Sequence, residues 1–285
     1  MKHQGTILRE AMKQGVVMCP GAWNGLVGAA IANLGFSSCY ISGGATANAA
    51  GYPDVGLITL GEMCHTIHQV ASASGLPVVV DADTGYDEAE SVANTIVRYD
   101  RNGAAGMHIE DQVFPKRCGH LDGKTLVSMS TMSQKIKIAS ENRLHDDFVL
   151  IARTDARSVD GLEAAIERGC AYRDAGADMV FPEGLQSEDE FAEFSKNCPG
   201  FLLANMTEFG KTPHISADRF GELGYNLVIY PVTFQRVAMH AITVCLQQLY
   251  KDGTASGFED RMQTRQELYS LLGYVPGETW SSPNG

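Results

Sequence analysis

The sequence lacks any apolar stretch that could cross a membrane, since no run approaches about 18 consecutive apolar residues. Residues 1–17 carry scattered charges and no apolar segment of signal-peptide length. The seven cysteines include no Cys-x-x-Cys pair, and their odd number without an export signal predicts reduced thiols. These absences predict a cytoplasmic protein with no membrane partner.

Positive charge is also scarce, because 22 Lys and Arg residues face 34 Asp and Glu residues, for a net charge of −12. Nucleic-acid binding needs basic patches that neutralise phosphates, so this balance excludes a nucleic-acid partner. An anionic substrate must then be held by a local group of cations or by a metal ion. The remaining composition, with 44% hydrophobic and 20% charged residues, is that of a globular protein.

Eight short apolar runs recur along the chain, and most are continuous rather than alternating. Continuous apolar runs are typical of strands that are covered on both faces. The predicted strands are Val16–Cys19, Phe36–Ile41, Leu76–Val80, Ala104–Ile109, Phe148–Ala152, Ala177–Phe181, Phe201–Ala204 and Asn226–Tyr230.

Helical spacing of apolar residues fills the segments between these runs. One stripe runs from Trp23 to Leu34 and stops at Gly35, and another runs from Leu162 to Tyr172. Strand and helix alternating eight times predict an α/β fold of the (β/α)8 barrel type. An open doubly wound sheet is the alternative, but no Gly-x-Gly-x-x-Gly motif opens the first helix.

The end of the chain differs from the rest. Val237–Tyr250 has the pattern of the eighth helix, a polar link follows at Lys251–Gly257, and Arg261–Leu272 has the pattern of an extra helix. We therefore predict a single barrel domain over residues 1–285, with residues 251–285 as a helical extension and polar tail.

In a barrel of this kind the functional residues lie just after the strands, at the carboxyl-terminal mouth. Polar or charged residues, or flexible glycines, follow seven of the eight predicted strands. They include Ser42-Gly43-Gly44, Asp81-Ala82-Asp83, Glu110-Asp111, Arg153-Thr154-Asp155, Glu183 and Asn205-Met206-Thr207-Glu208. A single one of these would be explained as a helix cap, but seven at one mouth indicate a site.

Three carboxylates, Asp81, Asp83 and Glu110, follow adjacent strands. Crowded carboxylates repel one another, and a divalent cation relieves that repulsion. Oxygen ligands without His or Cys at zinc spacing favour Mg2+, or Mn2+, over zinc. Arg153 offers a planar fork for a substrate carboxylate, and the backbone N–H groups near Gly43 offer donors for another anion. Together these groups predict a site for a small di- or tricarboxylic acid.

The stretch after Glu110 adds a thiol among cations. Cys118 follows Lys116 and Arg117 and precedes Gly119 and His120. Neighbouring positive charge stabilises a thiolate, so the pKa of Cys118 should fall below about 8.5, the value of a free thiol. Cys118 is therefore a candidate acid, base or nucleophile, although a solvated basic loop with an incidental cysteine is the alternative.

The run Lys116-Arg117-Cys118-Gly119-His120, with Asp81-Ala82-Asp83 and Ile109-Glu110-Asp111-Gln112 before it, resembles the isocitrate lyase/phosphoenolpyruvate mutase superfamily. The likeness extends from about Gly5 to Tyr274. The segments Asn205–Gly210 and Met262–Arg265 are similar to the bacterial 2-methylisocitrate lyase subfamily. That resemblance implies a Mg2+-dependent cleavage of 2-methylisocitrate to pyruvate and succinate, a step of propionate breakdown in the methylcitrate cycle. It also implies a homotetramer in which the last helices are exchanged between subunits.

The resemblance implies roles for particular residues. Asp81, Asp83 and Glu110 match the metal site, and Cys118 matches the group that protonates the succinate carbanion. Lys116 belongs to the same catalytic loop motif. Tyr40 and Asp54 are both candidates for the base that takes the hydroxyl proton. The residues that match substrate contacts are Ser42, Gly43, Gly44, Gly119, His120, Arg153, Glu183, Asn205, Thr207, Arg236 and Arg265.

Some positions depart from the family pattern. Ala45 stands where a third glycine is usual, Gly85-Tyr86-Asp87 replaces a more glycine-rich run, and Ile229 stands where a leucine is expected. These differences leave open a relative that acts on a shorter acid, such as 2,3-dimethylmalate or oxaloacetate. Phosphonate chemistry is a further alternative, but it has no need of Cys118. A catalytically silent assembly protein would have no need of the intact set of mouth residues.

Overall fold

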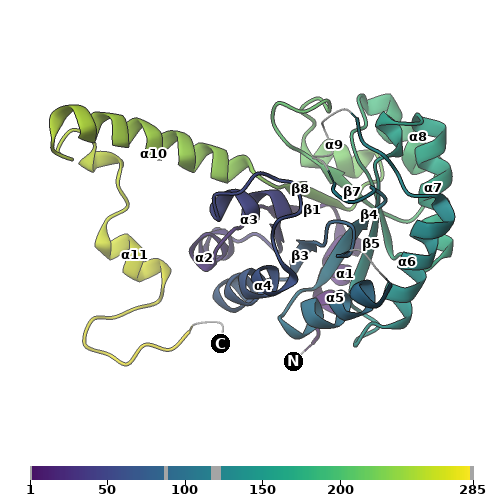
Figure 1. Cartoon of the computed structure of the whole chain (residues 1–285). Coiled ribbons are helices and arrows are strands. Elements are labelled where there is room, and N and C mark those ends of the chain that lie inside the picture. Colours follow the sequence, from purple (N-terminus) through teal and green to yellow (C-terminus); the bar gives the residue numbers. More distant parts are fainter. Residues whose placement is uncertain (1, 87–88, 117–122, 283–285) are drawn as a thin grey trace.

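The computed structural model describes residues 2–86, 89–116 and 123–282 and shows a barrel with a helical arm (Figure 1). Eight parallel strands form the barrel. They are β1 (Val17–Pro20), β2 (Cys39–Ile41), β3 (Val78–Asp81), β4 (Gly106–Glu110), β5 (Val149–Thr154), β6 (Met179–Pro182), β7 (Phe201–Asn205) and β8 (Leu227–Tyr230). All eight predicted strands are confirmed, with ends that shift by at most a few residues.

The strands pair in chain order from β2 to β8, and β8 returns to pair with β1. Val17 lies opposite Leu227 in that last pairing. Between β1 and β2 the contact narrows to one bridge, at Gly21 and Tyr40, so the barrel is nearly closed. The predicted (β/α)8 architecture is therefore confirmed.

Helices lie between successive strands around the outside of the barrel (Figure 1). They are α2 (Gly25–Asn33), α3 (Gly43–Ala49), α4 (Leu60–Ser74), α5 (Ala89–Arg101), α6 (Met129–Glu141), α7 (Leu162–Asp174), α8 (Glu188–Asn197), α9 (Ala217–Glu222) and the 3-10 turn η1 (Ala156–Ser158). Local sequence sets their ends. For example, the Asn24 side chain accepts a hydrogen bond from Val27 N at 3.0 Å to begin α2, and Gly35 follows its end at φ +86°.

The helix α1 (Gln4–Gln14) precedes the barrel and was not predicted from the sequence. Leu8 is 0% exposed and Met12 is 1% exposed, and both pack with residues of the barrel strands such as Val149 and Leu227. Arg9 Nη2 lies 2.9 Å from Asp178 Oδ2, just before β6. Arg9 Nε also donates to the backbone oxygen of Asp147 at 2.9 Å. Since Asp147 and Asp178 directly precede β5 and β6, α1 covers the amino-terminal end of the barrel, opposite the mouth.

The chain leaves the barrel through α10 (Thr233–Asp252), which extends away from the other helices (Figure 1). We call residues 233–282 the arm. Helix α10 begins earlier and ends later than the predicted Val237–Tyr250. The predicted extra helix Arg261–Leu272 is confirmed in part: the structure has the 3-10 turn η2 (Glu259–Arg261) and then α11 (Arg265–Leu271), which begins later than predicted. Thr264 causes the break, since its side chain caps α11 by accepting from Glu267 N at 3.2 Å.

The arm carries unburied apolar side chains along one side of α10. Met239, Ile242, Leu246 and Leu249 are between 41% and 59% exposed and recur at intervals of three and four residues. Within the described part of the chain, no helix is both long and apolar enough to span a bilayer. The exposed apolar stripe of α10 therefore indicates a surface that contacts protein.

Candidate active site

A cavity of about 190 Å³ opens at the carboxyl ends of the strands. We call it the mouth pocket. The structure brings most of the predicted site residues to its walls. These are Tyr40, Ser42, Gly44, Asp54, Asp81, Lys116, Arg153, Glu183, Asn205, Thr207 and Arg236. Gly43, Asp83 and Glu110 lie directly behind this wall, in contact with residues that line it.

Asp81 and Asp83 are held side by side at the end of β3. The backbone N–H of Gly43 donates to Asp81 Oδ2 at 3.0 Å, and the N–H of Asp83 donates to Asp81 Oδ1 at 2.9 Å. A Cβ atom on Gly43 would lie 3.0 Å from Asp81 Oδ2 and 3.2 Å from Asp83 Oδ1. A larger residue at this position would therefore push against the two carboxylates where the loop after β2 approaches them.

Lys116 supplies the positive charge of this cluster. Its ammonium is nearly buried, lies 2.8 Å from Asp83 Oδ1 and donates to Asp54 as well. Burial acts against this charge, yet the carboxyls of Asp83 and Asp81 raise the pKa of Lys116 well above its usual value. The sequence placed Lys116 in a basic loop, but the structure shows that it is a buried counter-ion.

The carboxyl groups behave differently from one another. Burial and the charge of Asp81 raise the pKa of Asp83 to about 6. Burial also opposes the charge of Asp81, but His108, Lys116 and Arg153 together lower its pKa to about 2. Burial raises the pKa of Glu110 well above its usual value, although Arg153 acts in the opposite direction. The cluster therefore has too little positive charge to keep all three carboxyls ionised.

A divalent cation fits this cluster. Glu110 Oε1 is buried and has no hydrogen-bond partner among the described residues. Asp81 and Asp83 lie at the end of β3, which is the neighbour of β4. Asp81 pairs with His108, and His108 lies two residues before Glu110 in β4, so the three carboxyl groups lie at neighbouring strand ends. Oxygen atoms of this kind, with space for water and substrate in the mouth pocket, are the ligands of Mg2+. Asp81, Asp83 and Glu110 are the residues that would hold it.

Arg153 is less available to a substrate than its sequence position indicates. Its Nε and Nη2 atoms donate to the two oxygens of Asp155 at 2.9 and 3.1 Å. Its Nη1 atom lies 3.2 Å from Glu110 Oε2. The edge of the guanidinium that would bind a carboxylate through two parallel bonds is thus already occupied by Asp155.

Asp155 also binds Lys124, which the sequence analysis did not consider. Lys124 Nζ donates to Asp155 Oδ1 at 2.8 Å, and both side chains are almost completely buried. Asp155 is therefore a buried carboxylate shared by two cations. A lysine in a turn carries no sequence signal for burial, so only the fold reveals this pair.

Asp111 follows Glu110 in sequence but has a structural role. Its side chain is fully buried and accepts from Thr154 Oγ1 and Tyr172 OH, each at 2.8 Å. The N–H of Asp155 donates to it at 2.9 Å, and Arg168 Nη1 donates at 3.2 Å. Asp111 thus joins the end of β4 to the end of β5 and to α7, below the substrate-facing surface.

A buried histidine inside β4 touches one of the two candidate bases. His108 Nε2 lies 2.7 Å from Tyr40 OH and 3.7 Å from Asp81 Oδ1. Burial lowers the pKa of His108 to about 4, so the ring is neutral at pH 7. Burial also raises the pKa of Tyr40 well above its usual value. Asp54, the other candidate base, is bound to Lys116.

The opposite wall of the mouth pocket is formed by the ends of β6 and β7 and the start of α10. Asn205 Nδ2 donates to the carboxylate of Glu183 at 3.2 Å. Arg236 Nη1 lies 3.3 Å from Thr207 Oγ1 and 2.9 Å from Glu208 Oε2. This wall therefore places a cation across the pocket from the carboxyl cluster.

Several predicted residues are not brought to the mouth by this structure. Cys118, Gly119 and His120 lie outside the described residues. Arg265 begins α11 on the arm and borders a surface hollow with Tyr269 and Tyr274 instead. Its contact with substrate remains a prediction.

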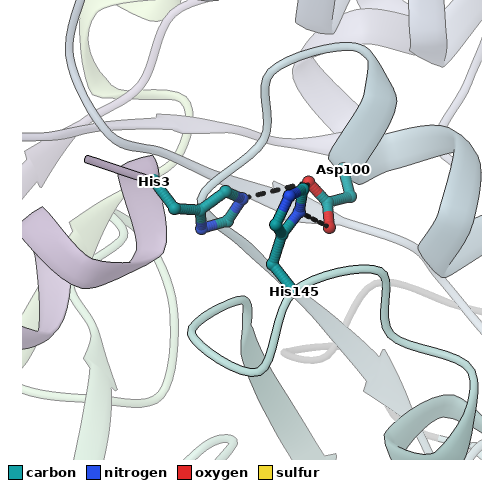
Figure 2. Close-up of side chains that lie close together, drawn as sticks. All are labelled: His3, Asp100 and His145. Carbon is teal, nitrogen blue, oxygen red and sulfur yellow. Dashed lines mark hydrogen bonds and ion pairs between the residues drawn. The ribbon is translucent and has the colours of Figure 1, made fainter. Parts of the chain in front are cut away.

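A second group of ligand-type side chains lies at the other end of the barrel (Figure 2). His3 Nε2 lies 3.0 Å from Asp100 Oδ1, and His145 Nδ1 lies 2.9 Å from Asp100 Oδ2. The two imidazole rings stack with centroids 4.4 Å apart, and His3 Nδ1 accepts from Gly5 N. Stacked rings do not aim their lone pairs at one point, and the capping bond requires the proton on Nε2. This group therefore has the geometry of a hydrogen-bonded tie between α1 and α5.

The carboxyl cluster, the buried Lys116 and Arg236 at the mouth of a (β/α)8 barrel have the arrangement of an enzyme active site. The model of the phosphoenolpyruvate phosphomutase family matches residues 8–250. The chain therefore belongs to this family, within the phosphoenolpyruvate mutase/isocitrate lyase superfamily, and the resemblance predicted from the sequence is confirmed.

Two relatives carry the name of one lyase. The chain is 49% identical to "Probable 2-methylisocitrate lyase 1" of Corynebacterium glutamicum over 91% of this chain and 85% of the relative. It is 45% identical to "2-methylisocitrate lyase" of Aeropyrum pernix over 96% and 89% of the two chains.

Solved structures show the same fold. A crystal structure of 2,3-dimethylmalate lyase matches with a TM-score of 0.90 at 37% identity, covering 96% of this chain and 92% of that one. A phosphonopyruvate hydrolase in complex with oxalate and Mg++ matches with a TM-score of 0.85 at 27% identity, covering 95% of each chain.

Proposed function

We propose that the protein is a cytoplasmic, Mg2+-dependent carbon–carbon lyase that cleaves 2-methylisocitrate to pyruvate and succinate, in the methylcitrate cycle of propionate breakdown. The observation that carries the proposal is the arrangement of the mouth pocket. Asp81 and Lys116 line one wall, and Arg236 lines another. A tricarboxylic acid such as 2-methylisocitrate could place its 2-hydroxy carboxylate at the wall with Asp81 and Lys116. Its other carboxylates could then bind at the wall with Arg236. The relatives named 2-methylisocitrate lyase support this choice of acid.

The chemistry begins with loss of the hydroxyl proton. When bound, Mg2+ acts as a Lewis acid on the oxygens of the substrate. Asp54 takes the hydroxyl proton, or Tyr40 takes it while its own phenol proton passes to the neutral His108. The adjacent carbon–carbon bond then breaks, and the new carbonyl becomes that of pyruvate. The electron pair remains on the carbon that becomes succinate. Cys118 donates a proton to that carbon, which completes succinate and leaves a thiolate.

Lys116 holds the charge of the site in place. Its contacts with Asp54 and Asp83 keep an ammonium beside the carboxyls that would bind the metal. Arg153 is tied to Asp155 and Glu110, so it contributes a fixed positive charge and its remaining N–H groups to the substrate. These groups are rigid because each is buried and bound on more than one side.

The proposal includes exchange of the arm between subunits of a homotetramer. The exposed apolar stripe of α10 is the support, because a stripe of this length is covered in a stable protein. The occupant is a second copy of the chain. Such an exchange is also the route by which Arg265 would reach a mouth pocket, since α11 lies on the arm.

A shorter acid is the second candidate. The structural likeness to 2,3-dimethylmalate lyase favours it, as does the absence of Arg265 from the described walls of the mouth pocket. The two candidates differ in the number of carboxylates, so they differ in the number of cations that the enzyme needs.

A coupled assay of pyruvate release, together with an assay of oxalate formation when oxaloacetate is the substrate, separates the candidates. We expect 2-methylisocitrate to be the best substrate in a panel that includes 2,3-dimethylmalate and oxaloacetate, with activity abolished by a chelator and restored by Mg2+. Arg265→Ala should reduce turnover of 2-methylisocitrate much more than turnover of 2,3-dimethylmalate. Cleavage of the shorter acids alone by the unmodified enzyme would replace the first candidate with the second.

A further inference from the structure

Phe209 combines exposure with an unfavourable backbone conformation. Its side chain is 94% exposed, and its φ angle is +61°. A residue with a Cβ atom is strained in the left-handed region, and Gly210 stands next to it in the sequence without taking that conformation. Because the ring is exposed, burial contributes little to offset the backbone strain at Phe209. A different contact of the ring must offset it.

The Phe209 ring contacts the side chain of Arg236. The guanidinium carbon of Arg236 lies 5.4 Å from the centroid of the ring, within the range of a cation–π interaction. Arg236 itself lines the mouth pocket, and its side chain is 43% exposed. The strained residue therefore bears directly on the cation that faces the carboxyl cluster.

Arg236 is also held from a second side. Its Nη1 atom donates to the backbone oxygen of Glu208 at 2.8 Å and to Glu208 Oε2 at 2.9 Å. Glu208 is fixed in turn, because Thr233 Oγ1 donates to its Oε1 at 2.5 Å. Thr233 begins α10, so the clamp connects the loop after β7 to the base of the arm.

Within the described part of the chain, the side-chain hydrogen bonds of Arg236 are all made by its Nη1 atom. They leave the edge formed by Nε and Nη2, which is the edge that binds a carboxylate through two parallel hydrogen bonds. In Arg153 the same edge is taken by Asp155. Of these two arginines, Arg236 is thus the one with an open fork.

We propose that Phe209 is a specificity-determining positioning residue: its ring holds the guanidinium of Arg236 so that the open Nε/Nη2 edge binds the substrate carboxylate farthest from the metal. The proposal rests on the proposed function for the identity of that acid. It predicts that Phe209 matters for acids that reach across the mouth pocket and not for acids that bind only at the carboxyl cluster.

Two simple dicarboxylates serve as probes of the Mg2+-loaded enzyme in calorimetric titrations. Succinate is long enough to present a distal carboxylate, whereas oxalate is compact and is named as a ligand in the related phosphonopyruvate hydrolase structure. We expect Phe209→Gly to weaken succinate binding about three- to five-fold, the loss corresponding to an exposed cation–π contact. Oxalate binding should stay unchanged.

Stability gives an independent signature. Phe209→Gly removes the left-handed strain together with an exposed ring, so its Tm should equal or exceed that of the unmodified enzyme. Phe209→Ala keeps the strain and should have a lower Tm than Phe209→Gly, with the same loss of succinate affinity. Phe209→Tyr keeps the ring and should restore succinate binding. Leu34→Ala, at a 76% exposed position on the end of α2, is the matched control.

A double-mutant cycle shows whether Phe209 acts through Arg236. In an Arg236→Ala background, Phe209→Gly should have no further effect on succinate binding. Equal weakening of succinate and oxalate, unchanged succinate binding in Phe209→Gly, or no binding of succinate by the unmodified enzyme would each overturn the proposal. Failure to release pyruvate from 2-methylisocitrate would overturn the proposed function instead, while the two-probe comparison would still decide the role of Phe209.

Discussion

Asp111→Asn should destabilise the protein strongly, although it only replaces one carboxylate oxygen with an amide nitrogen. Asp111 Oδ2 accepts from Thr154, Tyr172 and Arg168, and Oδ1 accepts from the N–H of Asp155. An asparagine keeps one oxygen and turns the other position into a donor. Whichever way the amide is placed, at least one buried donor faces another donor, and Arg168 loses its anionic partner.

The size of the effect follows from these contacts. An unsatisfied buried donor costs about 1–3 kcal/mol, and a hydrogen bond to a charged group contributes about 1.5–3 kcal/mol. The sum gives an expected loss of about 2.5–6 kcal/mol in the free energy of unfolding, a range that includes the usual cost of about 3–5 kcal/mol for breaking a buried ion pair. The residual activity should fall too, because Asp155 and therefore Arg153 depend on the position of this strand end.

Urea denaturation followed by circular dichroism measures the loss directly. The midpoint should fall with little change in the slope, since the surface exposed on unfolding is the same. Asp146→Asn is the matched control, because Asp146 is exposed and the same chemical change there should alter stability by less than about 0.5 kcal/mol. If Asp111→Asn also stayed within about 0.5 kcal/mol of the unmodified protein, the proposed role of the buried network would be wrong.

Three further outcomes are expected. Cys118→Ser should bind substrate normally but reduce kcat about 10²- to 10⁴-fold, and near-normal kcat in a folded variant would remove Cys118 from the mechanism. Mg2+ should raise the Tm of the metal-free protein near neutral pH, and the increase should shrink as the pH falls through about 6, because burial and Asp81 raise the pKa of Asp83 to about 6 and protons then compete for this ligand. An increase of the same size at about pH 5 would show that Asp83 is not a ligand. Leu246→Glu, at a 59% exposed position of α10, should dissociate the proposed tetramer in analytical ultracentrifugation, whereas the neighbouring exposed Gln247→Glu should not. A Leu246→Glu variant that assembles like the unmodified protein would exclude this stripe from the interface.

The barrel could be predicted because its strands are buried on both faces. Val78, Val79 and Val80 are all 0% exposed, so they form the continuous apolar run that the sequence shows. The position of Asp81 at the mouth then follows from chain order. By contrast, α1 was missed because its core contacts come from only two strongly buried apolar side chains, Leu8 and Met12, among charged residues.

Parts of the site could not be predicted because they depend on contacts between distant segments. Glu110 and Asp111 are adjacent acids in the sequence, and only the path of α7 decides that Asp111 is structural. The occupied fork of Arg153 has a different cause, because it depends on the backbone geometry that turns Asp155, two residues away, toward the guanidinium. The sequence also favours the left-handed conformation at Gly210, whereas the structure has it at Phe209.

The pairing of β1 with β8 has a consequence for how the chain is made. Val17 meets Leu227 across that pair, so the first strand to leave the ribosome has no partner on this side until almost the whole barrel has been translated. The other side of β1 offers only the bridge between Gly21 and Tyr40. Helix α1 also lacks its contacts at first, because its partners Asp147 and Asp178 are synthesised long after it. Closure of the barrel is therefore a late step in the folding of the newly made chain.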